Sequence, residues 1–384
     1  MSKIINPRRE FLKKASAASV ALTFSRPSFT KPLDTKKNKL PQWRGFNLLD
    51  FFNPVPENGR KTKTAYYQYM ADWGFDFARI PISYPSYLSF DRSKPIRPDE
   101  VLQFNSKILD EVDEIVHNCH QQGLHVSLNL HRAPGFCINA GFEEPYNLWE
   151  DEEALEAFCA HWEMWAKRYQ NISSKKLSFD LVNEPYKRLN PNDQHSPGGP
   201  VPVNEYRKVA EAALKTIKGI NKNRLVIADG NGGGGMAIPE FADLDLNQSC
   251  RGYFPMHISH HKAPWVFKDP ESLSEPNWPG THNERYYSKS DLEKHYEPWV
   301  ALLKQGVGVH CGELGCYNKT PHKVFLSWFE DILDILDDNG IGFGLWEFSG
   351  SFGLLNSGRT DIEYVDWYGE KLDKELLKLL MKYA

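Results

Sequence analysis

The chain of 384 residues is 41% hydrophobic and 25% charged, a globular composition that excludes a disordered, collagen-like or small disulfide-stapled protein. Its formal net charge is −4, but residues 1–40 carry ten Lys and Arg against two Asp and Glu, so residues 41–384 form an acidic body. Such a body argues against nucleic acid or an anionic membrane as a partner, because binding phosphates requires a basic surface. No apolar run approaches the roughly 20 residues of a membrane-spanning helix.

The basic first segment resembles an export signal. Arg8-Arg9-Glu10-Phe11-Leu12-Lys13 is similar to a twin-arginine motif, and the small, mildly apolar residues 15–24 follow it. Pro7 stands where Ser or Thr is usual, and no clean Ala-x-Ala cleavage site follows. We expect residues 1–40 to be an export signal and linker that directs the protein to the periplasm or the extracellular space. A disordered basic tail is the alternative.

From residue 43 onward, short β-rich runs alternate with longer amphipathic stretches. Several of the short runs are almost continuously apolar, as is typical of parallel strands buried on both faces. Strands are expected at residues 43–48, 75–81, 125–131, 177–184, 224–230, 252–257, 307–313 and 342–348. Helices are expected at 99–122, 150–169, 203–220, 290–304, 322–339 and 370–383.

This alternation predicts an α/β protein, a single (β/α)8 TIM barrel over residues 41–384. No composition break or linker divides the region into smaller domains. An open doubly wound sheet is the alternative, but no Gly-x-Gly-x-x-Gly follows the first strand.

Neither the cysteines nor the histidines predict a metal centre. The six cysteines lack Cys-x-x-Cys spacing and are expected to be buried free thiols. The cluster His257-x-x-His260-His261 leaves a metal site as an alternative. However, barrel metallohydrolases typically carry His-x-His on the first strand, which here reads Arg44-Gly45-Phe46-Asn47. We therefore expect no metal and no other cofactor.

Polar side chains lie at the ends of the predicted strands. The chemistry of a (β/α)8 barrel sits at the carboxyl-terminal face, where these ends meet. We therefore expect these side chains to surround one site. They are Arg79, His131, Asn183, Glu184, His257, Glu313 and Trp346.

Glu184 and Glu313, on the fourth and seventh predicted strands, form the pair that cleavage of a glycosidic bond requires. One carboxyl must hold a proton for the leaving oxygen, and the other must stay ionised to attack or stabilise the sugar cation. Arg79 is the cation expected to keep Glu313 charged. Fewer positive charges are expected beside Glu184, so Glu184 is then the acid.

Five motifs strengthen this interpretation. Phe179-Asp180-Leu181-Val182-Asn183-Glu184-Pro185 and Gly312-Glu313-Leu314-Gly315 contain the two acids. Ala78-Arg79-Ile80-Pro81, Asn129-Leu130-His131 with Ala133-Pro134-Gly135, and Leu345-Trp346-Glu347-Phe348 end three further strands. Taken in the order just given, they resemble the motifs on strands four, seven, two, three and eight of glycoside hydrolase family 5, the cellulase family of clan A. Along residues 43–384 they follow one another as they do in that family.

The resemblance implies roles for these residues. Glu313 would be the nucleophile and Glu184 the acid/base, with net retention through a glycosyl-enzyme intermediate. Asn183 would bind the sugar 2-hydroxyl, and Trp346 would stack beneath the sugar at the cleavage point. His131 and His257 would hold hydroxyls or order the carboxylates.

One position departs from the family pattern. Many members carry a Tyr, two residues after the strand-six histidine, that binds the nucleophile. Counted from His257, that position holds Ser259, which is too short to reach it. We expect His260, His261 or a water molecule to take this place.

These observations predict an exported, endo-acting β-glycanase whose substrate is a polysaccharide or oligosaccharide of β-1,4-glucan. The sequence carries no signal for the oligomeric state, and a monomer is favoured. Activity on β-mannan, xyloglucan or β-1,3-glucan, or exo-acting cleavage, remains open because loop shape decides among them. The loop aromatics Tyr146, Trp149, Trp265 and Trp278 are candidate outer subsites. A non-catalytic carbohydrate-binding barrel is the alternative from another class, although binding alone does not require paired acids. A transglycosylase is a third possibility.

Overall fold

The computed structural model describes residues 38–384 except residues 60, 140–142, 192 and 194. The twin-arginine-like motif and nearly all of the predicted leader lie outside the described residues. No helix in the part of the chain that the structure describes is long and apolar enough to cross a membrane.

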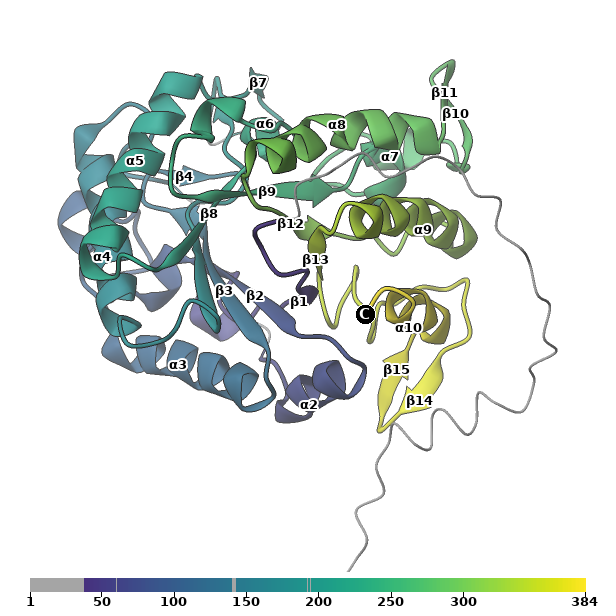
Figure 1. The fold of residues 1–384 in the computed structure, drawn as a ribbon, viewed down its shortest axis with the longest axis horizontal. Coiled ribbons are helices and arrows are strands. Elements are labelled where there is room, and N and C mark those ends of the chain that lie inside the picture. The colour runs from purple at the N-terminus through teal and green to yellow at the C-terminus, as the bar shows by residue number, and fades with distance from the viewer. Residues whose placement is uncertain (1–37, 60, 140–142, 192, 194) are drawn as a thin grey trace, which may run out of the picture.

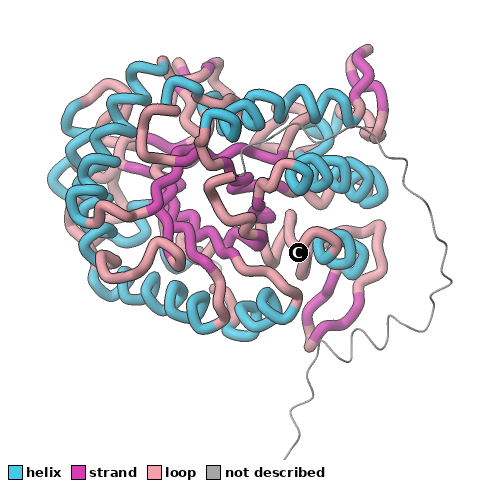
Figure 2. The backbone as a smooth tube through the Cα atoms, viewed as in Figure 1, coloured by secondary structure: helices cyan, strands magenta, loops and turns pink. Residues whose placement is uncertain are grey.

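Parallel strands close into a barrel, which confirms the predicted (β/α)8 fold (Figure 1). β2 pairs with both β1 and β3, and this second pairing closes the ring. The strands lie at the centre and the helices surround them (Figure 2). The barrel strands are β1 (Arg44–Asn47), β2 (Phe77–Ser83), β3 (His125–Ala133), β5 (Leu177–Asp180), β8 (Leu225–Asp229), β9 (Asn247–Gly252), β12 (Val309–Leu314) and β13 (Gly342–Leu345).

The outer layer consists of amphipathic helices, most of them at the predicted places. They are α2 (Thr64–Asp72), α3 (Ser106–Gln121), α4 (Glu152–Arg168), α5 (Val203–Ile220), α8 (Lys289–Gln305), α9 (His322–Asp338) and α10 (Lys374–Met381). Helix α2 was not predicted, and the predicted helix 99–122 is shorter because α3 begins at Ser106, where the Asn105 side chain caps it. The first residues of the predicted helix 370–383 form a strand instead.

Smaller elements decorate the barrel. β4 (Phe136–Cys137) extends β3 in antiparallel fashion, and hairpins form from β6 (Lys187–Arg188) with β7 (Gly198–Gly199), β10 (Gly280–His282) with β11 (Arg285–Tyr287), and β14 (Val365–Trp367) with β15 (Glu370–Leu372). Short helices are α6 (Asn231–Gly234) and α7 (Met256–Ser259), and 3-10 turns lie at Pro56–Asn58, Tyr84–Tyr87, Pro98–Glu100, Pro239–Phe241 and Pro270–Ser272.

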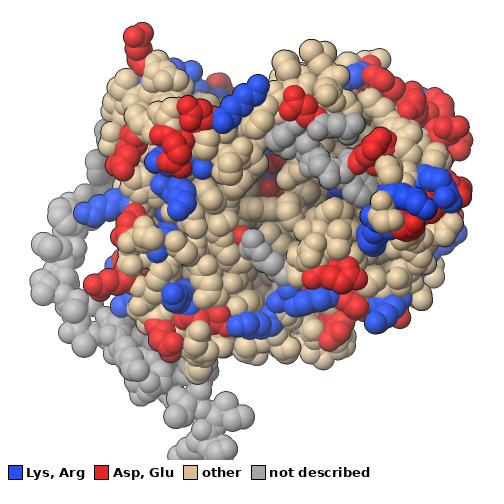
Figure 3. Space-filling model, turned by 180° about the vertical axis from the view of Figure 1, so that it is seen from behind, with Lys and Arg blue, Asp and Glu red and all other residues tan. Residues whose placement is uncertain are grey.

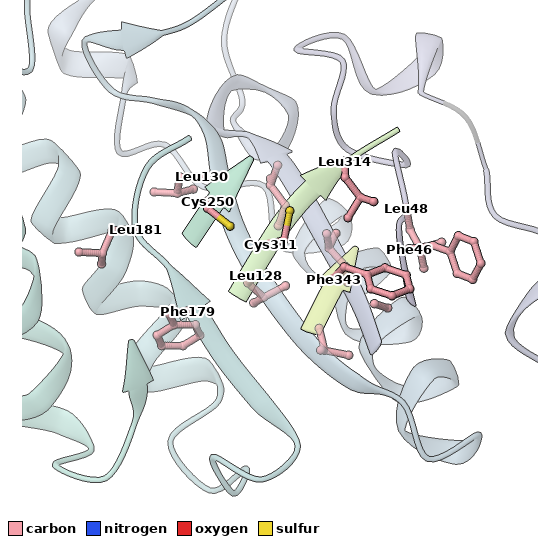
Figure 4. Packing of buried hydrophobic residues seen from close by; sticks show 14 of the residues in the cluster. Phe46, Leu48, Leu128, Leu130, Phe179, Leu181, Cys250, Cys311, Leu314 and Phe343 are labelled. Carbon is pink, nitrogen blue, oxygen red and sulfur yellow. The ribbon is translucent and has the colours of Figure 1, made fainter. Parts of the chain in front are cut away.

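Strand alternation separates the hydrophobic core from the polar site. Phe179 on β5 packs against Trp162 of α4, with ring centroids 5.0 Å apart. Successive strand residues point to opposite sides, so Asp180 faces the barrel interior and meets Arg79 there. Figure 4 shows the apolar residues Phe46, Phe343 and their neighbours around the strands. All six cysteines are free thiols; Cys137 and Cys159 are partly exposed and the others are buried.

The sixth barrel strand differs from the prediction. The run 252–257 is not a strand, because β9 spans Asn247–Gly252. Strand β9 was not recognised in the sequence because most of its residues are polar. In the fold, the Gln248 side-chain amide bonds both the backbone N–H and the C=O of Ile238, at 2.9 and 2.7 Å, so its burial leaves no polar group unpaired. As a result, Arg251 lies near the carboxyl end of this strand in place of His257.

Candidate active site

Arg79 on β2 organises the centre of the barrel mouth and is fully buried. Its Nε donates to Asp180 Oδ2 at 2.8 Å, and its Nη1 donates to Glu313 Oε1 at 2.6 Å. Its Nη2 donates to Asn183 Oδ1 at 2.9 Å. Arg79 and Glu313, which the sequence analysis expected to form an ion pair, are therefore in contact.

Glu313 on β12 is buried and receives several hydrogen bonds. Besides Arg79, the Tyr253 hydroxyl donates to its Oε2 at 3.2 Å, and Arg251 Nη2 approaches its Oε1 at 3.3 Å. These donors stabilise the negative charge of the carboxylate. The expectation that Ser259 leaves the tyrosine position empty is wrong: Tyr253, directly after β9, occupies it.

Glu184 lies just beyond β5 in a left-handed backbone conformation, with φ +48°. Its backbone N–H donates to Asp229 Oδ2 at 2.9 Å, and Arg251 Nε donates to its Oε1 at 2.8 Å. The Glu184 carboxyl therefore has a positive charge beside it, that of Arg251, which the sequence analysis did not expect. Burial and the nearby charge of Glu313 still outweigh Arg251 and raise the pKa of Glu184 to about 7.

Arg251 connects the two acids. Its Nη1 and Nη2 bind the two oxygens of Asp229, and Nη2 also donates to Asn183 Oδ1 at 2.9 Å. Since one guanidinium contacts both Glu184 and Glu313, the two carboxylates lie within reach of one small group placed between them. Such a group could be the carbon and oxygen atoms of a single glycosidic bond.

Behind these residues lie two further buried carboxyls, Asp180 and Asp229. Burial and the charge of Asp229 raise the pKa of Asp180 to about 7, although Arg79 opposes this shift. The described site thus gathers more carboxyl groups than guanidinium groups. The excess of negative charge and the burial favour protonation of Asp180 and Glu184 near neutral pH.

Asn183, His131 and Trp346 surround the acids. Both arginines donate to Asn183 Oδ1, which leaves its Nδ2 without a partner among the described residues. The His131 ring lies 5.6 Å from Trp346 with an interplanar angle of 24°, and its ring nitrogens also lack described partners. Burial and the Arg79 charge hold the pKa of His131 well below its usual range, so the ring is neutral. The site therefore offers unsatisfied polar atoms and one partly exposed indole to a ligand.

His257 does not belong to this group, contrary to the prediction. It lies in α7, and its ring stacks on His282 of the β10–β11 hairpin with centroids 3.9 Å apart. The sixth strand ends at Gly252, five residues before His257, so His257 lies beyond the end of the barrel. His260 packs its ring against Tyr253 at 4.9 Å instead of binding Glu313.

The loop aromatics divide into packed and accessible side chains. Trp278 is buried and donates to Asp331, and Trp149 is buried too. Trp265 is 38% exposed, beside Tyr317. A cavity of about 280 Å³ opens beside the segment that follows Glu184; its lining includes Arg132, Phe136, Tyr146, Trp149, Tyr186 and Arg188. Figure 3 shows a hollow near the centre of one face, with acidic atoms at its base.

Sequence reasoning missed Asp180, Asp229, Arg251 and Tyr253. Asp229 is an acidic residue at the end of the apolar run of β8, just as Glu313 follows the apolar run of its own strand. The sequence therefore contained the pattern needed to predict Asp229. Arg251 and Tyr253 were hidden by the misplaced strand. Among the described residues, no group of three or more His, Cys, Asp or Glu has the arrangement of a metal site.

Comparisons with known proteins agree with this fold and show the family of the chain. The family model described as cellulase, glycosyl hydrolase family 5, matches residues 33–351, most of the chain. The chain therefore belongs to glycoside hydrolase family 5 and is a glycoside hydrolase. Endoglucanase C of Acetivibrio thermocellus is 24% identical over 337 residues, which cover 82% of this chain and 89% of that protein. Cellodextrinase A of Ruminococcus flavefaciens is 23% identical, covering 71% and 74%.

Solved structures give the same result. A crystal structure described only as that of a glycoside hydrolase is 35% identical, with a TM-score of 0.79, and covers 89% of this chain and 99% of that one. Cel5A of Thermotoga maritima in complex with cellobiose is 21% identical, with a TM-score of 0.67, covering 88% and 96%. At that identity the likeness shows the fold alone.

Proposed function

We propose that this cellulase-like hydrolase cleaves β-1,4-glucan chains internally, with retention of configuration. Glu313 is the nucleophile and Glu184 is the general acid/base. The observation that carries the proposal is the contrast between two carboxyls that share one guanidinium. Glu313 receives Arg79 and Tyr253, whereas the pKa of Glu184 is raised to about 7. The surroundings thus supply hydrogen-bond donors to the attacking carboxylate and keep a proton on Glu184 up to about neutral pH.

In the first step, a Glu313 carboxylate oxygen attacks the anomeric carbon of the bound glycan. The bond from that carbon to the glycosidic oxygen breaks as the covalent glycosyl ester forms. Glu184 gives its proton to the departing oxygen, which leaves as a sugar hydroxyl. Arg79 and Tyr253 hold the attacking carboxylate in place throughout this step.

In the second step, Glu184 acts as the base. It takes a proton from a water molecule, whose oxygen attacks the anomeric carbon and displaces Glu313. Two inversions at the same carbon give net retention. Each carboxyl ends in the protonation state in which it began, so the site is ready for the next chain.

The surrounding residues position the sugar. Arg79 and Arg251 fix the Asn183 carbonyl oxygen, so its Nδ2 is the free donor and is suited to the 2-hydroxyl of the sugar at the cleavage point. Trp346 offers the ring on which that sugar stacks. His131, which is neutral, can both donate to and accept from sugar hydroxyls.

The relatives favour β-1,4-glucan as the substrate. Several curated relatives are named endoglucanases, and one is named a cellodextrinase. The Thermotoga maritima enzyme has been solved with cellobiose and also with mannotriose, so β-mannan is the second candidate. Xyloglucan, β-1,3-glucan and exo-acting cleavage remain alternatives. Export through residues 1–40 and a monomeric state also stay predictions.

Release of reducing sugar from a panel of polysaccharides tests the proposal. The panel contains soluble cellulose, β-mannan, xyloglucan and β-1,3-glucan, and product sizing separates internal from terminal cleavage. We expect short oligosaccharides from soluble cellulose with the native protein and none with Glu184→Gln or Glu313→Gln. Glu330→Gln is the matched control, since Glu330 pairs with Lys382 on the outer surface.

The outcomes separate the alternatives. Activity that survives Glu184→Gln and Glu313→Gln would defeat the mechanism. Binding of glycans without any release by the native protein would favour a carbohydrate-binding barrel. Products longer than the substrate would indicate a transglycosylase.

A further inference from the structure

Arg251 is placed to act on the acid/base itself. It lies near the carboxyl end of β9 and is only 3% exposed. Its Nε binds Glu184 Oε1 at 2.8 Å, while its Nη2 lies 3.3 Å from Glu313 Oε1. Thus one fixed positive charge contacts both carboxyls whose charges change during the proposed reaction.

Asp229 anchors this arginine and the backbone of Glu184 together. Its two oxygens bind the two Nη atoms of Arg251, and Oδ2 also accepts the Glu184 backbone N–H at 2.9 Å. That backbone hydrogen bond supports the left-handed conformation of Glu184, at φ +48°, which costs free energy for a residue with a Cβ. One carboxylate therefore fixes both the main chain and, through Arg251, the side chain of the acid/base.

We propose that Arg251, held by Asp229, is a positioning residue that sets the pH range over which Glu184 gives up and regains its proton. The inference rests on the proposed function, in which Glu184 is the acid/base. Glu184 must carry the proton when the glycosidic bond breaks and must lack it when water attacks. A guanidinium on its Oε1 favours the charged form. Arg251 thus limits how tightly the buried carboxyl holds its proton.

The same guanidinium links the two steps. While Glu313 is ionised, its charge favours the protonated form of Glu184 and also attracts Arg251. Once Glu313 is esterified, that charge is gone, and Arg251 is left with Asp229 and Glu184 as its anionic partners among the residues it contacts. Its stabilisation of the Glu184 carboxylate then favours the base form that the second step requires.

Other charged and titratable groups face Glu184 or Arg251 and are common to the variants compared below. Most come from the barrel strands or the residues directly after them, while Arg188 lies on β6 and Tyr206 on α5. The groups are Arg79, His131, Asp180, Arg188, Tyr206, Asp229, Tyr253, His310, Cys311 and Glu313.

The test compares Arg251→Gln, which removes the charge but keeps a hydrogen-bond donor, with Arg251→Lys, which keeps the charge. The pH profile of kcat/KM is measured on a cello-oligosaccharide, and thermal melting confirms that each variant folds. We expect the alkaline limb of the Gln variant to move up by about one pH unit or more. The Lys variant should keep the native limb position but lose plateau activity, because one ammonium cannot bind Asn183, Asp229 and Glu184 together.

A second readout follows the base step. With dinitrophenyl β-cellobioside the leaving group needs no proton, so kcat reports hydrolysis of the intermediate. For the Gln variant, the acidic limb of this kcat should also move up, since Glu184 then loses its proton at a higher pH. A merely structural arginine would lower the plateau and move neither limb.

Unmoved limbs in the Gln variant, or equal shifts in the Gln and Lys variants, would overturn the role of Arg251. If only the Lys variant folds, a native limb supports the proposal and a limb raised by about one unit contradicts it. Glu184→Gln and Glu313→Gln separate the two levels. If they are inactive while the Arg251 limbs stay fixed, only this inference fails, whereas activity in both would mean that the proposed function fails.

Discussion

Tyr253 donates its hydroxyl hydrogen to Oε2 of Glu313 across 3.2 Å. Burial and the charges of Glu313 and Glu184 hold the pKa of Tyr253 well above its usual range, so the phenol keeps its proton and is the donor in this hydrogen bond. Arg79 binds the other oxygen of the same carboxylate at 2.6 Å. The two contacts together fix the plane of the carboxylate from opposite ends.

Replacing Tyr253 with Phe tests that contact. The ring would still pack against His260 and Phe352, so the fold should remain intact. Loss of one hydrogen bond to a charged group should lower kcat/KM about tenfold, with little change in stability. Steady-state kinetics and thermal melting measure the two effects. A variant with native kcat/KM would show that the hydroxyl does not assist Glu313.

Glu184→Ala should affect natural and activated substrates differently. Loss of the general acid should lower kcat/KM on cello-oligosaccharides by about 10²–10⁴-fold. On dinitrophenyl β-cellobioside the first step should be largely spared, because that leaving group departs without a proton. Pre-steady-state release of dinitrophenol measures this step. Equal losses on both substrates would contradict the acid role of Glu184.

The pH profile of the native enzyme should reflect the raised pKa of Glu184. Burial, together with the charge of Glu313, raises this pKa to about 7. Below that pH Glu184 carries the proton needed for the first step, so kcat/KM should fall as the pH rises through about 7. A profile that stays flat up to pH 9 would show that Glu184 is not the titrating acid.

The same shift makes Glu184 a cost to stability at alkaline pH. Its pKa is higher in the folded state than the usual 4.5, so the folded protein binds the proton more tightly than the unfolded chain does. The free energy of unfolding therefore falls as the pH rises from about 4.5 through 7. Glu184→Gln, which stays neutral, should melt about 2–4 °C higher than the native protein at pH 8.

Melting curves of both proteins at pH 4 and pH 8 provide the control for this prediction. At pH 4 Glu184 is protonated in both states, and the difference between the two proteins should be small. If the two proteins differed in melting temperature by the same amount at pH 4 and pH 8, or if Glu184→Gln melted no higher at pH 8, the raised pKa of Glu184 would not be a cost to stability.

The sequence allowed much of the barrel and its two acids to be predicted because parallel strands are buried on both faces. Long apolar runs marked β2, β3 and β12, and a charged residue at the end of such a run had few structural reasons to be there. Glu184 and Glu313 carry this signal, together with the polar Asn183, whereas Arg79 interrupts the apolar run of β2. The structure brings all four into one hydrogen-bonded group.

The sixth strand could not be predicted in this way. Its residues Asn247, Gln248 and Ser249 are polar, and Gln248 is tolerated in the interior only because its amide meets the backbone of Ile238. That pairing is a tertiary contact with no local sequence pattern. The error moved the expected strand end from Arg251 to His257, and it concealed the arginine that binds both acids.

The most direct test of the central claim is covalent trapping of the nucleophile. A cellobioside with an activated leaving group, and with fluorine in place of the 2-hydroxyl, slows the second step more than the attack and lets the ester accumulate. Mass spectrometry of the digested protein then locates the sugar. We predict a single cellobiosyl adduct on Glu313, and none in Glu313→Gln. A label on another residue, or cleavage of the substrate with inversion and no adduct, would contradict the account.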